Sequence, residues 1–230
     1  MHDIAIGIFC KTPAAGLSKT RLSPPLRPEE CAAISACFIR DIGATIAEVA
    51  RDGGAIGYAV YTPAGSEAGL RALLPPGFRL LLQCDGDFGA RVAAAVRALL
   101  AAHAGVILVN ADSPTLPASI LRAALDATPR GGVVLSPSRD GGYTLIGLSQ
   151  LHERLFTDIP WSTAGVHRIT VARAKEIGCS VTEVPGWYDV DDAESLALLR
   201  RELAGEPLPF APAGSGATAP ATRSFFAQRR

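Results

Sequence analysis

Short runs of apolar, often β-branched residues alternate along this chain with longer stretches of helical character. The apolar runs lie at residues 4–9, 55–61, 79–83, 106–110, 133–136, 143–148 and 181–184. The helical stretches lie at residues 28–51, 65–74, 88–102, 117–127, 165–177 and 192–203. Strands that alternate with helices are typical of a parallel sheet covered on both faces. The pattern therefore predicts a three-layer α/β/α sandwich with a mostly parallel sheet.

The composition of the chain predicts where this domain ends. Of the 230 residues, 48% are hydrophobic and 19% are charged, which is enough apolar material for a sizeable core. We expect a single domain over residues 1–204. Residues 205–230 are rich in Gly, Pro, Ala and Ser, and such a segment buries little apolar surface. The tail is therefore predicted to be disordered.

Charge and cysteine usage exclude several classes of function. The 22 basic and 22 acidic residues balance, which argues against a nucleic-acid-binding protein. The five cysteines are odd in number and form no CxxC pair, so we expect reduced thiols in a cytoplasmic protein and no zinc site. The apolar run at 4–9 is too short for a membrane span and lacks a preceding basic segment, so it predicts a strand.

The loop after the first predicted strand is the first candidate for chemistry, because open α/β sheets bind ligands beyond the carboxyl ends of their strands. It carries Lys11, Gly16, Lys19, Thr20 and Arg21. A glycine permits close backbone approach to a phosphate, and the cations neutralise its charge. A flexible, solvated basic loop is the alternative. Neither the Walker sequence nor the dinucleotide fingerprint GxGxxG is present.

Acidic residues follow two further strands. Asp112 comes directly after the run at 106–110, and Asp189 and Asp191 are spaced to point the same way in an extended segment. Together they suit an oxygen-seeking Mg²⁺ or Mn²⁺. The alternatives are that Asp112 caps the next helix, and that Asp191 or Asp192 caps the helix at 192–203 while Asp189 is solvated.

Two weaker candidates complete the site. Asp140, Gly141 and Gly142 lie between two predicted strands, where the glycines permit close ligand contact but also suit a plain hairpin turn. Arg91 lies in the first turns of a predicted helix and either reaches a phosphate or stays on the surface.

Several motifs occur in one order along the chain and together carry a resemblance. They are KTPxxGxxKTRL (11–22), ADSPxL (111–116), PSxDGGYxLIGL (137–148), PWST (160–163) and WYDVD (187–191). In these motifs the chain resembles a bacterial family of small glycosyltransferase-like proteins with the nucleotide-diphospho-sugar transferase (GT-A) fold. It is similar, more distantly, to 2-phospholactate guanylyltransferase and the molybdenum-cofactor nucleotidyltransferases. The resemblance covers about residues 4–203.

The resemblance implies roles for particular residues. Lys11, Lys19 and Arg21 would hold nucleotide phosphates, whereas Asp112, Asp189 and Asp191 would hold the metal. The chain also departs from these families. The glycine-rich loop of sugar nucleotidyltransferases is reduced to one glycine, Gly16, and the DxD of many glycosyltransferases is replaced by Asn110-Ala111-Asp112.

These observations give a ranked set of functional hypotheses. The first is a metal-dependent glycosyltransferase that takes a nucleoside-diphosphate sugar and an unidentified small-molecule acceptor, with Asp112, Lys19 and Arg21 as catalytic residues. The second is nucleotidyl transfer from an NTP to a phosphorylated small molecule, with pyrophosphate release; three cations in one loop suit a triphosphate. The third is a catalytically degenerate nucleotide-binding protein, as the missing first carboxylate at Asn110 suggests.

Overall fold

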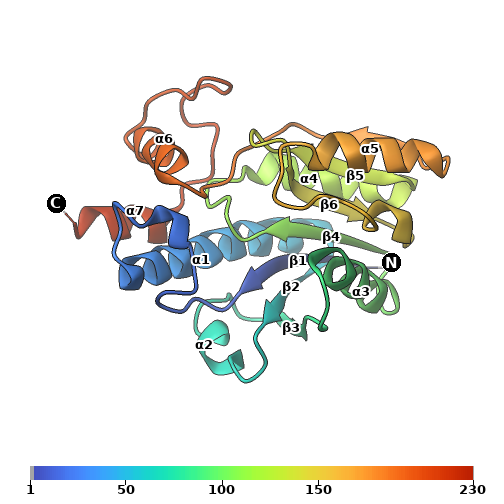
Figure 1. The fold of residues 1–230 in the computed structure, drawn as a ribbon, viewed down its shortest axis with the longest axis horizontal. Coiled ribbons are helices and arrows are strands. Elements are labelled where there is room, and N and C mark those ends of the chain that lie inside the picture. Colours follow the sequence, from blue (N-terminus) through green and yellow to red (C-terminus); the bar gives the residue numbers. More distant parts are fainter. Residues whose placement is uncertain (1–2, 230) are drawn as a thin grey trace.

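The computed structural model describes residues 3–229, which are built around a seven-stranded sheet of order β3-β2-β1-β4-β6-β5-β7 (Figure 1). The strands are β1 (Ile4–Lys11), β2 (Ala55–Thr62), β3 (Arg79–Leu82), β4 (Gly105–Asn110), β5 (Val133–Pro137), β6 (Tyr143–Leu148) and β7 (Val181–Glu183). Only β6 runs antiparallel to its neighbours, β4 and β5. The predicted mostly parallel sheet is confirmed.

Helices cover both faces of this sheet. They are α1 (Pro28–Gly53), α2 (Glu67–Arg71), α3 (Phe88–Leu100), α4 (Ala118–Ala127), α5 (Val166–Glu176), α6 (Ala193–Leu203) and α7 (Pro220–Ala227), with short 3₁₀ turns at Thr20–Leu22, Thr128–Arg130 and Glu153–Leu155. Residues of α1, α4 and α6 share one apolar cluster, and residues of α3 and α5 share the other. Within residues 3–229, no helix is both long enough and apolar enough to cross a membrane.

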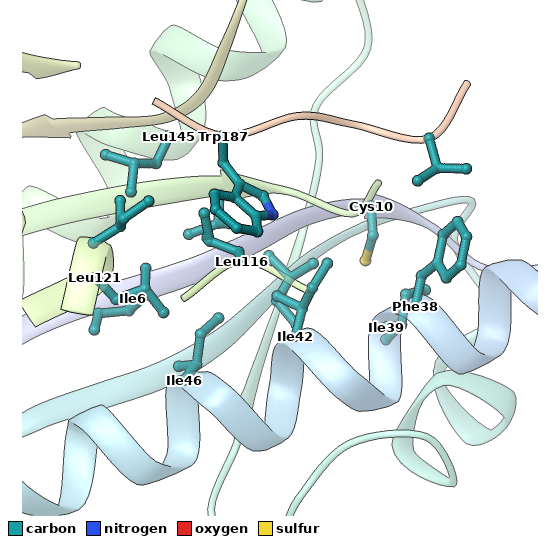
Figure 2. Packing of buried hydrophobic residues seen from close by; sticks show 14 of the residues in the cluster. Ile6, Cys10, Phe38, Ile39, Ile42, Ile46, Leu116, Leu121, Leu145 and Trp187 are labelled. Carbon is teal, nitrogen blue, oxygen red and sulfur yellow. The ribbon is translucent and has the colours of Figure 1, made fainter. Parts of the chain in front are cut away.

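Strand β1 contributes to both apolar clusters because its side chains alternate between the two faces. Ile6 lies in the same cluster as Ile42 and Ile46 of α1 (Figure 2). Ile8 belongs to this cluster too, and all four side chains are fully buried. Ala5 lies in the cluster on the opposite face. Burial of one such isoleucine contributes about 1.5–3 kcal/mol, so this packing fixes β1 and the start of the loop that follows it.

Two aspartates near the predicted site cap the N-termini of helices. Asp87 caps α3 by accepting a hydrogen bond from the Ala90 amide at 2.8 Å. Asp192 caps α6 by accepting one from the Ser195 amide at 2.9 Å. Of the two residues that the sequence offered as this cap, Asp192 takes the role, and the carboxylate of Asp191 therefore remains available for other contacts.

The C-terminal segment differs from the disorder that its composition predicts. Helix α7 packs against α1, and its first turn binds Asp41: the Ala221 amide donates at 2.9 Å, the Thr222 amide at 2.8 Å and the Thr222 hydroxyl at 2.6 Å. The prediction is wrong for the described part of residues 205–230. The segment is poor in apolar residues, but a carboxylate from another helix satisfies its free amide groups.

Candidate functional site

Strands β1 and β4 are neighbours, so the loop after β1 and the turn after β4 begin at the same edge of the sheet. Phe9 of β1 lies opposite Asn110 of β4. The Asn110 side-chain oxygen accepts a hydrogen bond from the Asp112 amide at 3.2 Å. Asn110 thus stabilises the turn that presents Asp112.

The segment before α6 crosses the same edge. The Trp187 amide donates to the Pro137 carbonyl at 3.0 Å, and the Val190 amide donates to the Asp112 carbonyl at 2.8 Å. The Trp187 indole also donates to the Thr115 hydroxyl at 3.1 Å. These contacts place the residues between Trp187 and α6, which include Asp189 and Asp191, beside the turn after β4.

Lys19 links the three groups. Its ammonium lies 2.5 Å from Asp112 Oδ1 and 2.8 Å from Asp191 Oδ1, and it donates to the Val190 carbonyl at 2.7 Å. The Lys19 side chain is only 7% exposed. Burial alone would lower the pKa of Lys19, but the two carboxylates outweigh burial and raise it, so the ammonium stays charged. Its backbone is left-handed, with φ of 50°, a conformation that few lysines adopt.

Arg21 contacts the same carboxylate from the solvent side. Its guanidinium lies 2.5 Å from Asp191 Oδ2, and its side chain is 70% exposed. An exposed ion pair of this kind contributes little to stability. Arg21 can therefore leave Asp191 at small cost and contact an anionic ligand.

Asp189 lies in an acidic environment. Its Oδ1 accepts a hydrogen bond from the Ser138 hydroxyl at 2.8 Å. Burial first, and then the nearby charges of Asp140, Asp191 and Asp112, raise the pKa of Asp189 to about 6, although the Ser138 hydrogen bond opposes this rise. The site therefore holds more negative charge than its neighbouring cations neutralise.

This charge imbalance bears on the metal that the sequence predicts. Asp191 uses both oxygens on Lys19 and Arg21, whereas Asp112 and Asp189 each keep one oxygen without a partner among the described residues. No three His, Cys, Asp or Glu side chains in residues 3–229 are grouped so that they could hold a metal alone. Mg²⁺ usually takes one or two carboxylates together with substrate phosphates, so Asp112 and Asp189 fit as part of such a ligand set.

Two adjoining cavities share this charged wall. Phe9, Arg21, Ala111, Asp112 and Asp191 line both of them. The smaller cavity, of about 290 Å³, lies against the loop after β1. The larger, of about 550 Å³, extends toward α3 and the β5–β6 turn. We call them the loop cavity and the main cleft.

Aromatic rings form one wall of the main cleft. The ring centroids of Phe9 and Phe88 lie 5.3 Å apart, those of Phe88 and Trp161 4.8 Å, and those of Trp161 and Tyr143 6.4 Å, all with edge-on geometry. Gly89 allows this arrangement, because a Cβ there would lie 3.0 Å from the Trp161 indole nitrogen and 2.2 Å from the Phe156 carbonyl oxygen. The cleft thus combines an apolar wall with a carboxylate-rich edge.

The residues predicted to bind a nucleotide divide between the cavities. Lys11, Lys19, Thr20 and Arg21 line the loop cavity. Arg91, Asp140 and Gly142 line the main cleft, as does Arg21 again.

Two predicted glycines line neither cavity. Gly16 has φ of +72° with open space around it. Gly141, with φ of +90°, packs so closely that a Cβ would lie 2.1 Å from the Ala164 carbonyl oxygen. The role of Gly141 is therefore to let the β5–β6 turn approach the start of α5, to which its carbonyl binds through the His167 amide at 2.9 Å.

Some residues of the site were not singled out from the sequence. Ser138 holds Asp189, and Gln83 binds Arg91 at 2.9 Å. Phe88 contributes to the aromatic wall while 39% exposed. A signal existed for Ser138, since it lies within one of the quoted motifs, but a serine in a turn has many uses. For Gln83 and Phe88, only the packing of distant segments reveals a role.

Comparison with known proteins assigns the chain to a protein family. The model of one protein family, described as "Uncharacterized protein conserved in bacteria (DUF2064)", matches residues 45–163. No curated protein matches the chain.

Solved structures with the same fold include a protein from Desulfovibrio desulfuricans G20, provisionally assigned as a nucleotide-diphospho-sugar transferase. It has a TM-score of 0.83 and 26% identity, and the match covers 100% of this chain and 96% of that one. 4-diphosphocytidyl-2C-methyl-D-erythritol synthase from Anaerococcus prevotii DSM 20548 has a TM-score of 0.58 and 10% identity, with coverage of 87% and 97%. CMP:2-keto-3-deoxy-manno-octonic acid synthetase, complexed with CTP, has a TM-score of 0.57 and 12% identity, with coverage of 88% and 98%. The nucleotide-diphospho-sugar transferase fold that the motifs predict is confirmed.

Proposed function

The chain belongs to the family described as "Uncharacterized protein conserved in bacteria (DUF2064)". From the geometry of its site, we propose that the protein is a transferase that uses a nucleotide-activated donor. The observation that carries the proposal is the shared wall of Arg21, Asp112 and Asp191 between the loop cavity and the main cleft. A transferase must hold two substrates with their reacting atoms about 3–3.5 Å apart. Two adjoining cavities, with charged groups where they meet, suit that requirement.

The loop cavity is the better place for the phosphates of the donor. Lys11 and Arg21 are exposed cations, so they can turn toward phosphate oxygens. Lys19 is different, because an ammonium has three donors and all three are taken by Asp112, Asp191 and the Val190 carbonyl. We therefore assign Lys19 as a positioning residue that fixes the two carboxylates, and not as a phosphate ligand.

Asp112 and Asp189 are the residues that would hold a divalent metal, Mg²⁺ or Mn²⁺. When bound, the metal would offset negative charge on the diphosphate leaving group. Arg21 would share that task, because it lines both cavities and its ion pair with Asp191 Oδ2 is exposed to solvent. Ser138 orients Asp189 toward this edge through its hydroxyl.

Glycosyl transfer from a nucleoside-diphosphate sugar is the first candidate reaction. It is supported by the relative from Desulfovibrio desulfuricans G20, which is 26% identical over the whole chain and carries the provisional name of a nucleotide-diphospho-sugar transferase. Nucleotidyl transfer from an NTP is the second. It is favoured by Lys11 at the end of β1 and Arg21 on the loop after it, two exposed cations that can turn toward the phosphates of a triphosphate.

Product analysis separates the two reactions. The full-length protein is incubated with Mg²⁺ or Mn²⁺ and either sugar nucleotides or NTPs, together with a panel of hydroxyl and phosphorylated acceptors. Release of UDP or GDP identifies glycosyl transfer, whereas release of pyrophosphate identifies nucleotidyl transfer. Nucleotide binding that needs no metal and leads to no turnover would instead support the catalytically degenerate alternative.

Asp112→Asn tests the role of this carboxylate in turnover. The substitution keeps the shape of the side chain and removes its charge, so we expect kcat to fall by roughly 10²-fold or more. Asp126→Asn, on the helix α4, is the matched control. Wild-type turnover by Asp112→Asn would show that the metal and catalytic assignments of Asp112 are wrong.

A further inference from the structure

Arg91 projects from the first turns of α3 into the main cleft and has no acidic partner. One guanidinium nitrogen donates to Gln83 Oε1 at 2.9 Å, and the guanidinium lies over the Phe88 ring, 5.6 Å from its centroid. Among the described residues, Arg91 Nε is buried without any hydrogen-bond partner. Carboxylates line the same cleft, yet none of those described forms an ion pair with Arg91, although arginines elsewhere in the chain pair readily with acids.

Gln83 fixes the position of the Arg91 guanidinium. Gln83 is 8% exposed, and its amide nitrogen donates to the carbonyls of Cys10 at 3.1 Å and Val60 at 2.9 Å. Its amide oxygen therefore has to face Arg91. The guanidinium therefore contacts a buried glutamine, which is bound to β1 and β2, and an aromatic ring. These contacts preorganise Arg91, unlike a freely moving surface arginine.

Arg91 also lies apart from Lys11 and Lys19, while Arg21 lines both cavities. Lys11 and Lys19 line the loop cavity and Arg91 does not, whereas Arg91 lines the main cleft with Phe88 and Trp161. The main cleft thus has a carboxylate edge at Asp112, an aromatic wall, and one unpaired guanidinium. Its volume of about 550 Å³ is that of a small-molecule site.

We propose that Arg91 is the anion receptor of an acceptor subsite in the main cleft, and that the acceptor is a small molecule with a phosphate or carboxylate group. This inference rests on the proposed function, since it takes the loop cavity as the place of the donor phosphates. The anion of the acceptor binds the guanidinium of Arg91, while its body lies against Phe88 and Trp161. That arrangement directs the other end of the acceptor toward Asp112 and the donor.

Tryptophan fluorescence of the full-length protein can test the subsite without knowledge of the acceptor. Trp161 lies in the wall beside Phe88, whereas Trp187 is buried and supplies a constant background. The probes are inorganic phosphate and acetate, titrated with and without saturating UDP or GDP. We expect saturable binding of at least one probe, and the tighter probe identifies the chemical class of the anion. Binding should persist when the nucleotide is present.

Substitutions distinguish the acceptor subsite from the donor site. Arg91→Met should weaken binding of the anion probe at least tenfold and change nucleotide affinity less than twofold. Lys11→Met should show the opposite pattern. Arg97→Met, on the same helix but paired with Glu153, should change neither affinity. Arg91→Lys keeps the charge but loses the two-pronged geometry, so it should bind the anion several-fold more weakly, and it is the variant to use if Arg91→Met does not fold.

Several results would overturn the proposal. They are displacement of the anion by the nucleotide, a tenfold loss of nucleotide affinity in Arg91→Met, wild-type anion affinity in Arg91→Lys, or no anion binding by the wild-type protein. If nucleotides bind and the anion probes do not, only the subsite fails. If no nucleotide binds, with or without metal, the proposed function itself fails.

Discussion

At the scale of single residues, the ammonium of Lys19 joins Asp112, Asp191 and the Val190 carbonyl. It is nearly buried and contacts two carboxylates that are each about one third exposed. Breaking a buried ion pair usually costs more than the pair contributes, because the remaining charge is left without compensation. The contacts of Lys19 are therefore expected to matter for stability as well as for the geometry of Asp112 and Asp191.

Lys19→Met should lower the free energy of unfolding by about 2 kcal/mol, less than for a fully buried pair because solvent screens the two carboxylates. Urea denaturation measures the change, and Lys11→Met, at the exposed end of β1, is the control. If Lys19→Met were as stable as the wild type, the three contacts of the ammonium would have no energetic weight.

Asp189 predicts a pH dependence of stability. Its pKa is raised from the usual 3.8 to about 6, first by burial and then by Asp140. A carboxyl group whose pKa is higher in the folded state favours folding when protonated, so its contribution is full below its unfolded pKa and is lost as the pH rises to about 6. Asp189→Asn should remove this loss and increase stability at pH 7 on the order of 1 kcal/mol.

Urea denaturation of both proteins at a series of pH values checks this expectation. The stability difference between Asp189→Asn and the wild type should grow from pH 4 to pH 6 and then stay constant. A difference that does not depend on pH would show that Asp189 titrates normally. Addition of Mg²⁺ or Mn²⁺ should reduce the advantage of the variant if Asp189 is a metal ligand.

The sequence predicted the acidic residues of the site and the loop cations, but not how they pair. Asp112 follows a strongly apolar strand, and strand ends are visible in a pattern of hydrophobicity. The contact between Lys19 and Asp191, in contrast, depends on a left-handed backbone at Lys19 and on hydrogen bonds from the segment at 187–191. Neither feature leaves a local trace in the residue types.

At the scale of elements, the contact between α1 and α7 joins two segments that lie far apart in the sequence. Asp41 accepts three hydrogen bonds from Ala221 and Thr222, and its carboxylate lies at the positive end of α7. Arg229 of the same segment pairs with Glu30 at the start of α1. The C-terminal segment is thus attached to the helix that packs on β1.

Asp41→Ala should release α7. The change leaves the amide of Thr222 and its hydroxyl without a partner, so the free energy of unfolding should fall by about 1–3 kcal/mol. Hydrogen exchange should show faster exchange in residues 220–227, and Arg40→Ala, at the exposed neighbouring position, is the control. Unchanged protection of α7 would mean that Asp41 is not its anchor.

Most elements were predicted within a few residues, because their apolar periodicity is a local signal. The strand at 4–9 extends to Lys11, and the helix at 28–51 extends to Gly53. Disorder of the tail was predicted wrongly because the partner of α7 lies 181 residues earlier, at Asp41. Composition describes what a segment can bury alone, and it does not describe what another element offers it.

At the scale of the whole molecule, the donor should stabilise the fold as a unit. A ligand at about 100 times its Kd stabilises a protein by about 2.7 kcal/mol, which for a chain of this size raises Tm by about 5–10 °C. Thermal-shift screening of NTPs, NDPs and sugar nucleotides, with and without Mg²⁺ or Mn²⁺, measures this. Stabilisation by a sugar nucleotide only with metal favours glycosyl transfer, and stabilisation by an NTP favours nucleotidyl transfer. No shift with any of them would contradict the assigned site.

The reversed direction of β6 has a consequence for how such a protein can diversify. Since β5 and β6 form a hairpin, their connecting turn at residues 138–142 emerges at the same sheet edge as Asp112. A hairpin turn can be lengthened, shortened or exchanged without moving a helix or shifting the register of a parallel crossover. Loop grafting at this turn, with Ser138 kept for Asp189 and Gly141 kept for the start of α5, would therefore change the rim of the main cleft while the core stays constant. This makes the turn a natural starting point for directed evolution of acceptor choice.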